Sequence, residues 1–456
     1  MTLKNRRIIV VGGLAAGPSA AAKAKRTNPN ADVKMYEASE SISYAICETP
    51  YLIGGLIEDE SKLEIYSPQK FQKEKDVNVH TLHLVEKIIP SKHKIIVRDL
   101  RSRDVFEEEY DKLIIATGSR SRRLGIDGES CRNVFNLKYR EDALNILNFL
   151  KTEKPKSAVI IGGGYVGMEI AEGLRSRNIE VTMLHQFKLP MEGLEQESRE
   201  RILAELNNND VQFIPNVKVE ALQQDATGLV KHVITDRGSF ESDMVIISIG
   251  VLPNTDLARD ANIRVGTLGG IITDERQQTN VDDIYAAGDC CEVKNIVTNK
   301  PIYLPLATVA SRAAWVAGEN AAGGRAVFKG AIRAMAVKIF NLQVAQVGIG
   351  SEEASQYGYK TITEIVNARS KNELMPGSEE VVIKFIVDKT SNRLLGANLF
   401  SCCGAFQRAN TLAVAIQQKM TIDEISRLDL IYAPPFSPLW DPILIGANQI
   451  KKKLLL

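Results

Sequence analysis

The segment AVIIGGGYVG, residues 158–167, decides the fold of this chain because it joins an apolar run to a glycine-rich turn. Residues 158–161 predict a buried parallel strand, and a helix opens directly after the turn with Met168 and Glu169. The turn holds a complete G-x-G-x-x-G pattern between strand and helix, which indicates a site for the pyrophosphate of a dinucleotide. The candidate contacts are Gly162, Gly164, Tyr165, Val166 and Gly167.

The next predicted strand, Val181–Leu184, ends at His185. A site specific for NAD usually has Asp or Glu at this position, where a carboxylate binds the ribose and repels a 2′-phosphate. With His185, Gln186 and Lys188 here, the sequence predicts no such repulsion, so NADPH is a candidate and NADH stays open. The alternative interpretation is that His185 is a solvent-exposed residue at a strand end, without a cofactor contact.

A related pattern, GGLAAG at residues 12–17, follows the apolar run Ile8–Val11 near the N-terminus. Leu14 replaces its middle glycine, so the pattern is weak on its own. Glu37 ends the next predicted strand 20 residues after Gly17, where a carboxylate can bind an adenosine ribose. The candidate contacts are Gly12, Gly13, Ala16, Gly17 and Glu37.

Three further segments strengthen this interpretation, since in each a predicted strand leads into a tight turn. They are residues 111–118 (DKLIIATG), 243–250 (DMVIISIG) and 279–289 (TNVDDIYAAGD). Together with the two glycine turns they give five signals in a fixed order, which chance does not readily produce.

In this order the signals resemble the flavoproteins with two dinucleotide-binding domains in the pyridine nucleotide–disulfide oxidoreductase family. The resemblance covers nearly the whole chain and implies an α/β fold with two Rossmann-like domains and a C-terminal α+β dimerisation domain. FAD would bind residues 1–118 and 250–325, NAD(P)H would bind residues 119–249, and residues 330–456 would form the dimer. In the family the last Asp binds the ribityl chain of FAD, which points to Asp289. The other contacts in these segments are Ala116, Thr117, Gly118, Gly250 and Gly288.

Cys47 lies in SYAICETPYLIGG, residues 43–55. The position five residues later is Leu52 rather than a second cysteine, so the thiol has no near neighbour for a disulfide. We therefore expect Cys47 to alternate between a thiolate, stabilised by the helix that follows, and a bond to an external group. Its frame resembles the single-cysteine branch of the family, which holds CoA-disulfide reductases, NAD(P)H sulfur or persulfide reductases, NADH oxidases and NADH peroxidases. The alternative is a buried, inert thiol.

The segment DLIYAPPFSPLWDP, residues 429–442, closely resembles CoA-disulfide reductases. Their tyrosine reaches the cysteine of the other subunit as a proton donor or hydrogen-bond partner, which implies that role for Tyr432. The alternative is an aromatic residue packed in a proline-rich turn. Two departures leave the substrate open. Glu48 follows the cysteine and, if turned inward, would raise the pKa of the thiol, while Leu374–Met375 stand where the family often has a second tyrosine.

The resemblance implies an FAD-dependent NAD(P)H oxidoreductase, homodimeric and cytoplasmic, that passes electrons to a disulfide or persulfide bonded to Cys47. The expected acceptors are CoA disulfide, CoA persulfide or polysulfide. Three cations could pair with the phosphates of CoA or, alternatively, form a solvated helix face, namely Lys23, Lys25 and Arg26.

Two alternative functions remain. The chain could be the FAD-containing, NAD(P)-linked subunit of a larger redox complex, such as a 2-oxoacid oxidoreductase, which Glu48 and the missing tyrosine favour. It could also be an NADH oxidase, although Ala15 stands where such enzymes typically have a His.

Length, charge and cysteine usage exclude other classes. A chain of 456 residues should form two to four domains. Its net charge of +1 argues against nucleic acid or an anionic membrane as the main partner. No stretch approaches the roughly 18 apolar residues of a membrane span. Six cysteines, in two adjacent pairs and two single positions, indicate neither a disulfide framework nor a metal site and fit a reducing cytoplasm.

Overall fold

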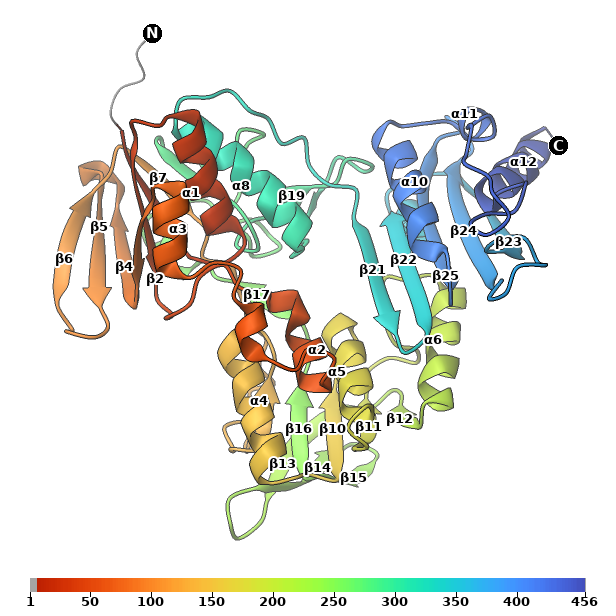
Figure 1. The fold of residues 1–456 in the computed structure, drawn as a ribbon, viewed down its shortest axis with the longest axis horizontal. Coiled ribbons are helices and arrows are strands. Elements are labelled where there is room, and N and C mark those ends of the chain that lie inside the picture. The colour runs from red at the N-terminus through yellow and green to blue at the C-terminus, as the bar shows by residue number, and fades with distance from the viewer. Residues whose placement is uncertain (1–5, 456) are drawn as a thin grey trace.

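The computed structural model describes residues 6–455 and shows three lobes (Figure 1). The first lobe lies at the upper left of the view, the second lies below it, and the third, coloured blue, lies to the right. No helix within the described range is long and apolar enough to cross a membrane. The mixed α/β architecture with two parallel sheets and a separate C-terminal lobe confirms the predicted fold class.

The first lobe is built on a five-stranded parallel sheet with the order β18-β7-β1-β2-β3. Within β1, Ile8 and Val10 pack against helices while Ile9 and Val11 pack against a second, antiparallel sheet, which explains why this run is apolar throughout. The parallel strands are β1 (Arg7–Val11), β2 (Asp32–Glu37), β3 (Asn78–Thr81), β7 (Lys112–Ile115) and β18 (Ile284–Ala286). The helices are α1 (Ala16–Thr27), α3 (Pro68–Lys75) and α8 (Ala307–Ala321), and the antiparallel strands are β4 (His83–Ile89), β5 (Lys94–Asp99) and β6 (Val105–Glu109).

The second lobe repeats this plan with the parallel sheet β12-β11-β10-β16-β9. Ala158 and Ile160 face helices, and Val159 and Ile161 face an antiparallel sheet, as in β1. The parallel strands are β9 (Val134–Asn136), β10 (Ser157–Ile161), β11 (Glu180–Leu184), β12 (Val211–Ile214) and β16 (Met244–Ile247). The helices are α4 (Arg140–Thr152), α5 (Tyr165–Arg175) and α6 (Gln196–Asn208), and the antiparallel strands are β13 (Val219–Gln224), β14 (Val230–Thr235) and β15 (Gly238–Glu241).

The third lobe holds an antiparallel sheet with the order β21-β22-β25-β24-β23, covered by helices. Its strands are β21 (Ala334–Ile339), β22 (Leu342–Gly348), β23 (Thr361–Arg369), β24 (Glu380–Asp388) and β25 (Leu394–Ser401). Its helices are α9 (Ser351–Gln356), α10 (Ala405–Gln417), α11 (Ile422–Ile425) and α12 (Pro442–Leu454). This arrangement agrees with the expected α+β character of the C-terminal region.

One short helix crosses from the first lobe onto the second. Helix α2 (Thr49–Gly54) follows Cys47 directly and packs against α5 (Figure 1). The two helices approach so closely that a Cβ added at Gly54 would lie 2.9 Å from Cα of Gly173. The segment that carries Cys47 is therefore held at the junction of the two parallel-sheet lobes.

Candidate active site

A cavity of about 860 Å³ opens in the first lobe where β1, β2 and β7 end. Most residues that the sequence predicted for this site line it, namely Gly12, Gly13, Ala16, Glu37, Cys47, Ala116, Thr117, Gly118 and Asp289. Gly17, Gly250 and Gly288 lie outside the lining. A Cβ at Gly17 would sit 1.8 Å from the carbonyl oxygen of Gly12, so that glycine allows the turn to close on its helix.

The first glycine turn has the geometry of an anion site. Gly12 has a φ of +111°, and a Cβ there would lie 2.2 Å from the carbonyl oxygen of Ala116. Helix α1 has no side-chain N-cap and no acidic residue in its first turn, so its first N–H groups are available to a phosphate. The Glu37 carboxylate accepts hydrogen bonds from the N–H groups of Gly13 at 2.6 Å and Ser39 at 2.8 Å, which fixes it in the cavity wall.

Asp289 is held by two side chains that the sequence reasoning missed. Its Oδ2 accepts hydrogen bonds from Ser119 Oγ at 2.9 Å and from Lys138 Nζ at 3.1 Å. Both donors line the same cavity. Ser119 begins the short strand β8 (Ser119–Ser121), and Lys138 lies between β9 and α4 in the second lobe. Ser119 directly follows the predicted Gly118, whereas no local motif marks Lys138, because the packing of the two lobes brings it to Asp289.

Cys47 lies in a 3-10 turn, Ile46–Glu48, and its side chain is exposed in the cavity wall. The thiol is therefore not buried, and its reactivity stays a prediction. The pKa of Cys47 is raised, first because the surrounding atoms desolvate the thiolate and second because of the charge on Glu48, whereas Lys138 lowers it. Helix α2, which follows the thiol, has only six residues, and its stabilising effect on the thiolate stays a prediction.

Glu169, near the start of α5, is a further residue that the sequence reasoning passed over. Its charge raises the pKa of Cys47, as the charge of the exposed Glu48 does. Burial and the nearby Glu172 raise the pKa of Glu169 itself to about 7. A carboxyl group with this pKa can hold a proton near neutral pH. The sequence signal that could have identified Glu169 is its position two residues after the G-x-G-x-x-G pattern.

The second glycine turn repeats the first in its backbone geometry. Gly162 has a φ of +110°, and a Cβ there would lie 2.2 Å from the carbonyl oxygen of Ser248. Helix α5 starts directly after Gly164 without a side-chain cap. His185 is buried, and its Nδ1 accepts the N–H of Gly163 at 3.1 Å, so the interpretation as a solvent-exposed residue is wrong. Tyr165 and Val166 begin α5 and are partly buried.

Tyr432 lies in an irregular segment of the third lobe between α11 and α12. Its side chain is 44% exposed and is absent from the cavity lining of its own chain, so one chain does not bring Tyr432 to Cys47. The N–H of Asn372 donates to Pro434 O at 3.3 Å, which joins the Tyr432 segment to the loop that carries Leu374. Large apolar side chains are exposed in these two segments, namely Leu374, Ile431, Phe436, Leu439 and Trp440. Such a surface is typical of a protein interface.

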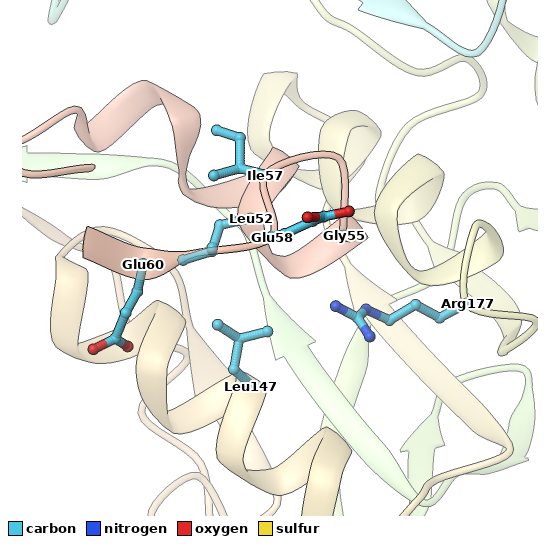
Figure 2. A pocket seen from close by; sticks show the side chains of 7 residues that line it. All are labelled: Leu52, Gly55, Ile57, Glu58, Glu60, Leu147 and Arg177. Atoms are coloured by element: carbon cyan, nitrogen blue, oxygen red, sulfur yellow. The ribbon is translucent and has the colours of Figure 1, made fainter. Parts of the chain in front are cut away.

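A smaller cavity of about 390 Å³ lies at the junction beside α2. Figure 2 shows the side chain of Arg177 reaching toward the end of α2, and Arg177 Nε donates a hydrogen bond to Ile53 O. Leu52, which stands where a second cysteine would be needed, is 3% exposed and lines this cavity. The remaining lining residues are Gly55, Ile57, Glu58, Glu60 and Leu147. None of the predicted cofactor contacts is among them, so we regard this cavity as part of the joint between the lobes.

The sequence profile of the pyridine nucleotide-disulphide oxidoreductase family matches residues 6–314, and the profile of its dimerisation domain matches residues 334–442. The chain belongs to this family. Membership makes it an oxidoreductase and implies a flavin and a pyridine nucleotide as cofactors. The match to the dimerisation domain supports a homodimer.

Similar members of the family include named sulfur-reducing enzymes. An NAD(P)H coenzyme A polysulfide/persulfide reductase of Pyrococcus horikoshii is 32% identical over 98% of this chain and 98% of its own length. A coenzyme A disulfide reductase of Staphylococcus aureus is 30% identical over 94% of this chain and 96% of its own length.

Solved structures with the same fold give a similar picture. Reduced Bacillus anthracis CoADR-RHD has a TM-score of 0.96 and 31% identity, covering 99% of this chain and 81% of the other. The water-forming NADH oxidase of Lactobacillus brevis, bound to NADH, has a TM-score of 0.94 and 29% identity, covering 99% of both chains. The family therefore includes both sulfur and oxygen chemistry on this scaffold.

Proposed function

We propose that the chain is an FAD-dependent NAD(P)H oxidoreductase that reduces a disulfide or persulfide bonded to Cys47. The observation that carries the proposal is the exposed Cys47 thiol in the wall of the large cavity, with the buried Leu52 where a second cysteine would be needed. Cys290 and Cys291 are buried behind Asp289, and the thiol of Cys290 donates to backbone carbonyls. The sulfur that bonds to Cys47 therefore comes from outside this chain.

The large cavity fits FAD. An added Cβ at Gly13 would lie 2.8 Å from Ile42 and 2.9 Å from Glu37, so the glycine lets the Glu37 side chain pack directly against the turn. The uncapped start of α1 would hold the pyrophosphate, and Glu37 would bind the adenosine ribose. Asp289 would bind the ribityl chain, with Ser119 and Lys138 fixing its carboxylate.

The second glycine turn fits NAD(P)H for the same reasons. The uncapped start of α5, preceded by Gly162 and Gly164, would hold the pyrophosphate, and His185 stands at the ribose position. These assignments place FAD in residues 1–118 and 250–325 and NAD(P)H in residues 119–249. Bound FAD would supply the relay that carries an electron pair from the nicotinamide to the sulfur bonded to Cys47.

The residues around Cys47 control the charge of its sulfur. Two electrons and one proton convert the Cys47–S–S–R bond into the Cys47 thiolate and a free thiol, R–SH. Lys138 stabilises that thiolate, since it lowers the pKa of Cys47. A proton on Glu169, whose pKa is about 7, removes a negative charge that would oppose the thiolate. The partner subunit's Tyr432 would assist protonation of the leaving sulfur in the homodimer.

A CoA-derived acceptor is supported by a cationic surface on α1. The exposed Arg26 lies 5.2 Å from the ring centre of Trp315, which is 51% exposed, whereas Lys23, 5.9 Å from the ring, is paired with Glu319 at 2.8 Å. Cations beside an exposed aromatic ring can bind phosphates and stack a base. Lys25 instead binds Ala31 O and Asp76, so it belongs to the structure of the first lobe. The similarity to enzymes named for coenzyme A points the same way.

Turnover by the Cys47→Ser variant tests the proposal. Anaerobic oxidation of NADH or NADPH should depend on CoA disulfide, CoA persulfide or polysulfide, and should be lost in Cys47→Ser but kept in Cys131→Ser. Reduction of a protein acceptor that survives Cys47→Ser would instead identify an electron-transfer subunit of a larger complex. Oxygen as the best acceptor would identify an NADH oxidase. Cytoplasmic location stays a prediction.

A further inference from the structure

In both glycine turns, the N–H of the second glycine donates a hydrogen bond to the side chain expected at the ribose, but the accepting group differs. The N–H of Gly13 donates to Glu37 Oε2 at 2.6 Å, and the N–H of Gly163 donates to His185 Nδ1 at 3.1 Å. His185 therefore occupies the place of the carboxylate that binds a ribose in the first lobe. Because Nδ1 is an acceptor, the ring is neutral and carries its proton on Nε2. His185, at the end of β11, thus supplies no negative charge to the site.

The loop that follows β11 brings a carboxylate next to His185. His185 Nε2 donates to Glu192 Oε1 at 3.1 Å. The loop folds back onto the glycine turn, because the N–H of Met191 donates to Gly163 O at 2.9 Å. The Glu192 side chain is 41% exposed, whereas that of His185 is 6% exposed, so the carboxylate is the outward end of the pair. The outward group beside the imidazole is therefore a carboxylate, which is also the ion-pair partner of Arg199.

Arg199 of α6 fixes this loop rather than offering a free cation. Its guanidinium donates to Pro190 O at 2.9 Å, to Leu189 O at 2.7 Å and to Glu192 Oε1 at 3.0 Å. The guanidinium is thus committed to protein acceptors. The remaining cation of the loop, Lys188, is exposed.

We propose that Glu192 is the residue that makes this site prefer NADH over NADPH. Its carboxylate accepts the 2′-hydroxyl hydrogen of the adenosine ribose and repels the dianionic phosphate that NADPH carries at the same position. This inference rests on the proposed nucleotide function of the second lobe. It differs from the sequence-based expectation that no repulsion acts here, which considered His185 and its immediate neighbours but not a residue seven positions further on.

Binding of the oxidised nucleotides tests the proposal without any turnover. Isothermal titration calorimetry of the purified flavoprotein should show NAD⁺ binding at least about tenfold more tightly than NADP⁺. Glu192→Gln keeps an oxygen for His185 and Arg199 but removes the charge, so it should reduce that ratio about tenfold, chiefly by tighter binding of NADP⁺. Glu180→Gln, at the opposite, exposed end of β11, is the matched control and should leave the ratio unchanged.

Three outcomes would overturn the assignment. The wild-type protein could bind NADP⁺ as tightly as NAD⁺. If Lys188→Met then lost NADP⁺ binding, Lys188 would be the discriminating residue. Glu192→Gln could leave the ratio unchanged. It could also weaken both nucleotides equally, which would show that Glu192 only holds the loop. Failure of the sulfur chemistry would affect none of these binding measurements, so the two proposals fail separately.

Discussion

Lys138 and Asp289 form an ion pair 3.1 Å long across the junction of the first two lobes, with side chains only 19% and 18% exposed. Lys138 follows β9 in the second lobe, and Asp289 follows β18 in the first. The same ammonium group lowers the pKa of Cys47. One cation thus contacts Asp289 in the predicted flavin cavity, acts on the Cys47 thiol and joins the first two lobes.

Removal of this cation should make the thiol less acidic. In Lys138→Met the pKa of Cys47 should rise further, so alkylation of Cys47 by iodoacetamide should require a higher pH than in the wild type. Mass spectrometry of the Cys47 peptide over a pH series measures this shift. Lys112→Met, which breaks a partly buried Lys–Asp pair of the first lobe at Asp283, is the control and should leave the alkylation profile unchanged. An identical profile for Lys138→Met would show that Lys138 does not act on the thiol.

Glu169 should make the stability of the protein depend on pH in a known direction. Its pKa is raised in the folded state to about 7, so the folded protein binds its proton more tightly than the unfolded chain does. Relative to Glu169→Gln, the free energy of unfolding of the wild type should therefore fall as pH rises from about 4.5 to about 7. Urea titrations of both proteins across this range measure the difference. A difference that stays constant with pH would contradict the raised pKa.

At Gly12, the close approach to Ala116 should contribute more to the loss of stability on substitution than the positive φ does. Gly12→Ala adds a Cβ that meets Ala116 O at 2.2 Å, whereas Gly125 has a φ of +72° with nothing within 4 Å of an added Cβ. Gly125→Ala should cost about 1 kcal/mol of unfolding free energy from backbone strain alone. Gly12→Ala should cost roughly 1–3 kcal/mol more and lose flavin, because the turn must open to relieve the contact.

Urea unfolding and the ratio of flavin to protein absorbance measure both effects. Equal losses in the two variants would mean that the contact with Ala116 relaxes without cost.

The Tyr432 segment should depend on a buried ion pair. Arg408 Nη2 lies 2.8 Å from Asp441 Oδ2, with side chains 7% and 11% exposed, and Asp441 also accepts from Ser437 Oγ and Ile443 N. Asp441→Asn leaves the guanidinium buried without its counter-charge, so it should cost about 3 kcal/mol or more. Acceptor reduction should fall as well, because Asp441 anchors the segment that ends at α12.

Thermal unfolding and turnover of Asp441→Asn measure the two losses. Asp423→Asn breaks ion pairs with Arg427 and Lys451 on the surface of the same lobe, and should have little effect on either quantity. A similar small effect of Asp441→Asn would show that the buried pair does not hold the segment.

The parts of the site that could be predicted from sequence are those set by local backbone geometry. Both glycine turns and Glu37 were found because a strand, a turn and a helix fix the spacing between them. Lys138 and Glu169 were missed because they act on Cys47 across the junction of two lobes, a proximity that no motif spacing encodes. Glu192 was missed because a loop of seven residues folds back to His185.

The net direction of the Cys47 pKa could not be predicted from sequence for a related reason. A helix does follow Cys47, as expected, but the pKa of the thiol depends on its desolvation and on the acidic groups packed around it. The role of Tyr432 stays a prediction, because it lies outside the cavity of its own chain. Sequence thus located the thiol and the glycine turns, whereas the charged groups around them depend on tertiary packing.

The most direct test of the account is whether Cys47 itself carries the substrate sulfur through turnover. The oxidised protein should be treated anaerobically with CoA disulfide and examined by intact-mass and peptide mass spectrometry before and after addition of NADH. We predict one CoA adduct per chain at Cys47, released on addition of NADH. An unmodified Cys47 in a protein that still reduces CoA disulfide, or an adduct that NADH does not release, would contradict the central claim.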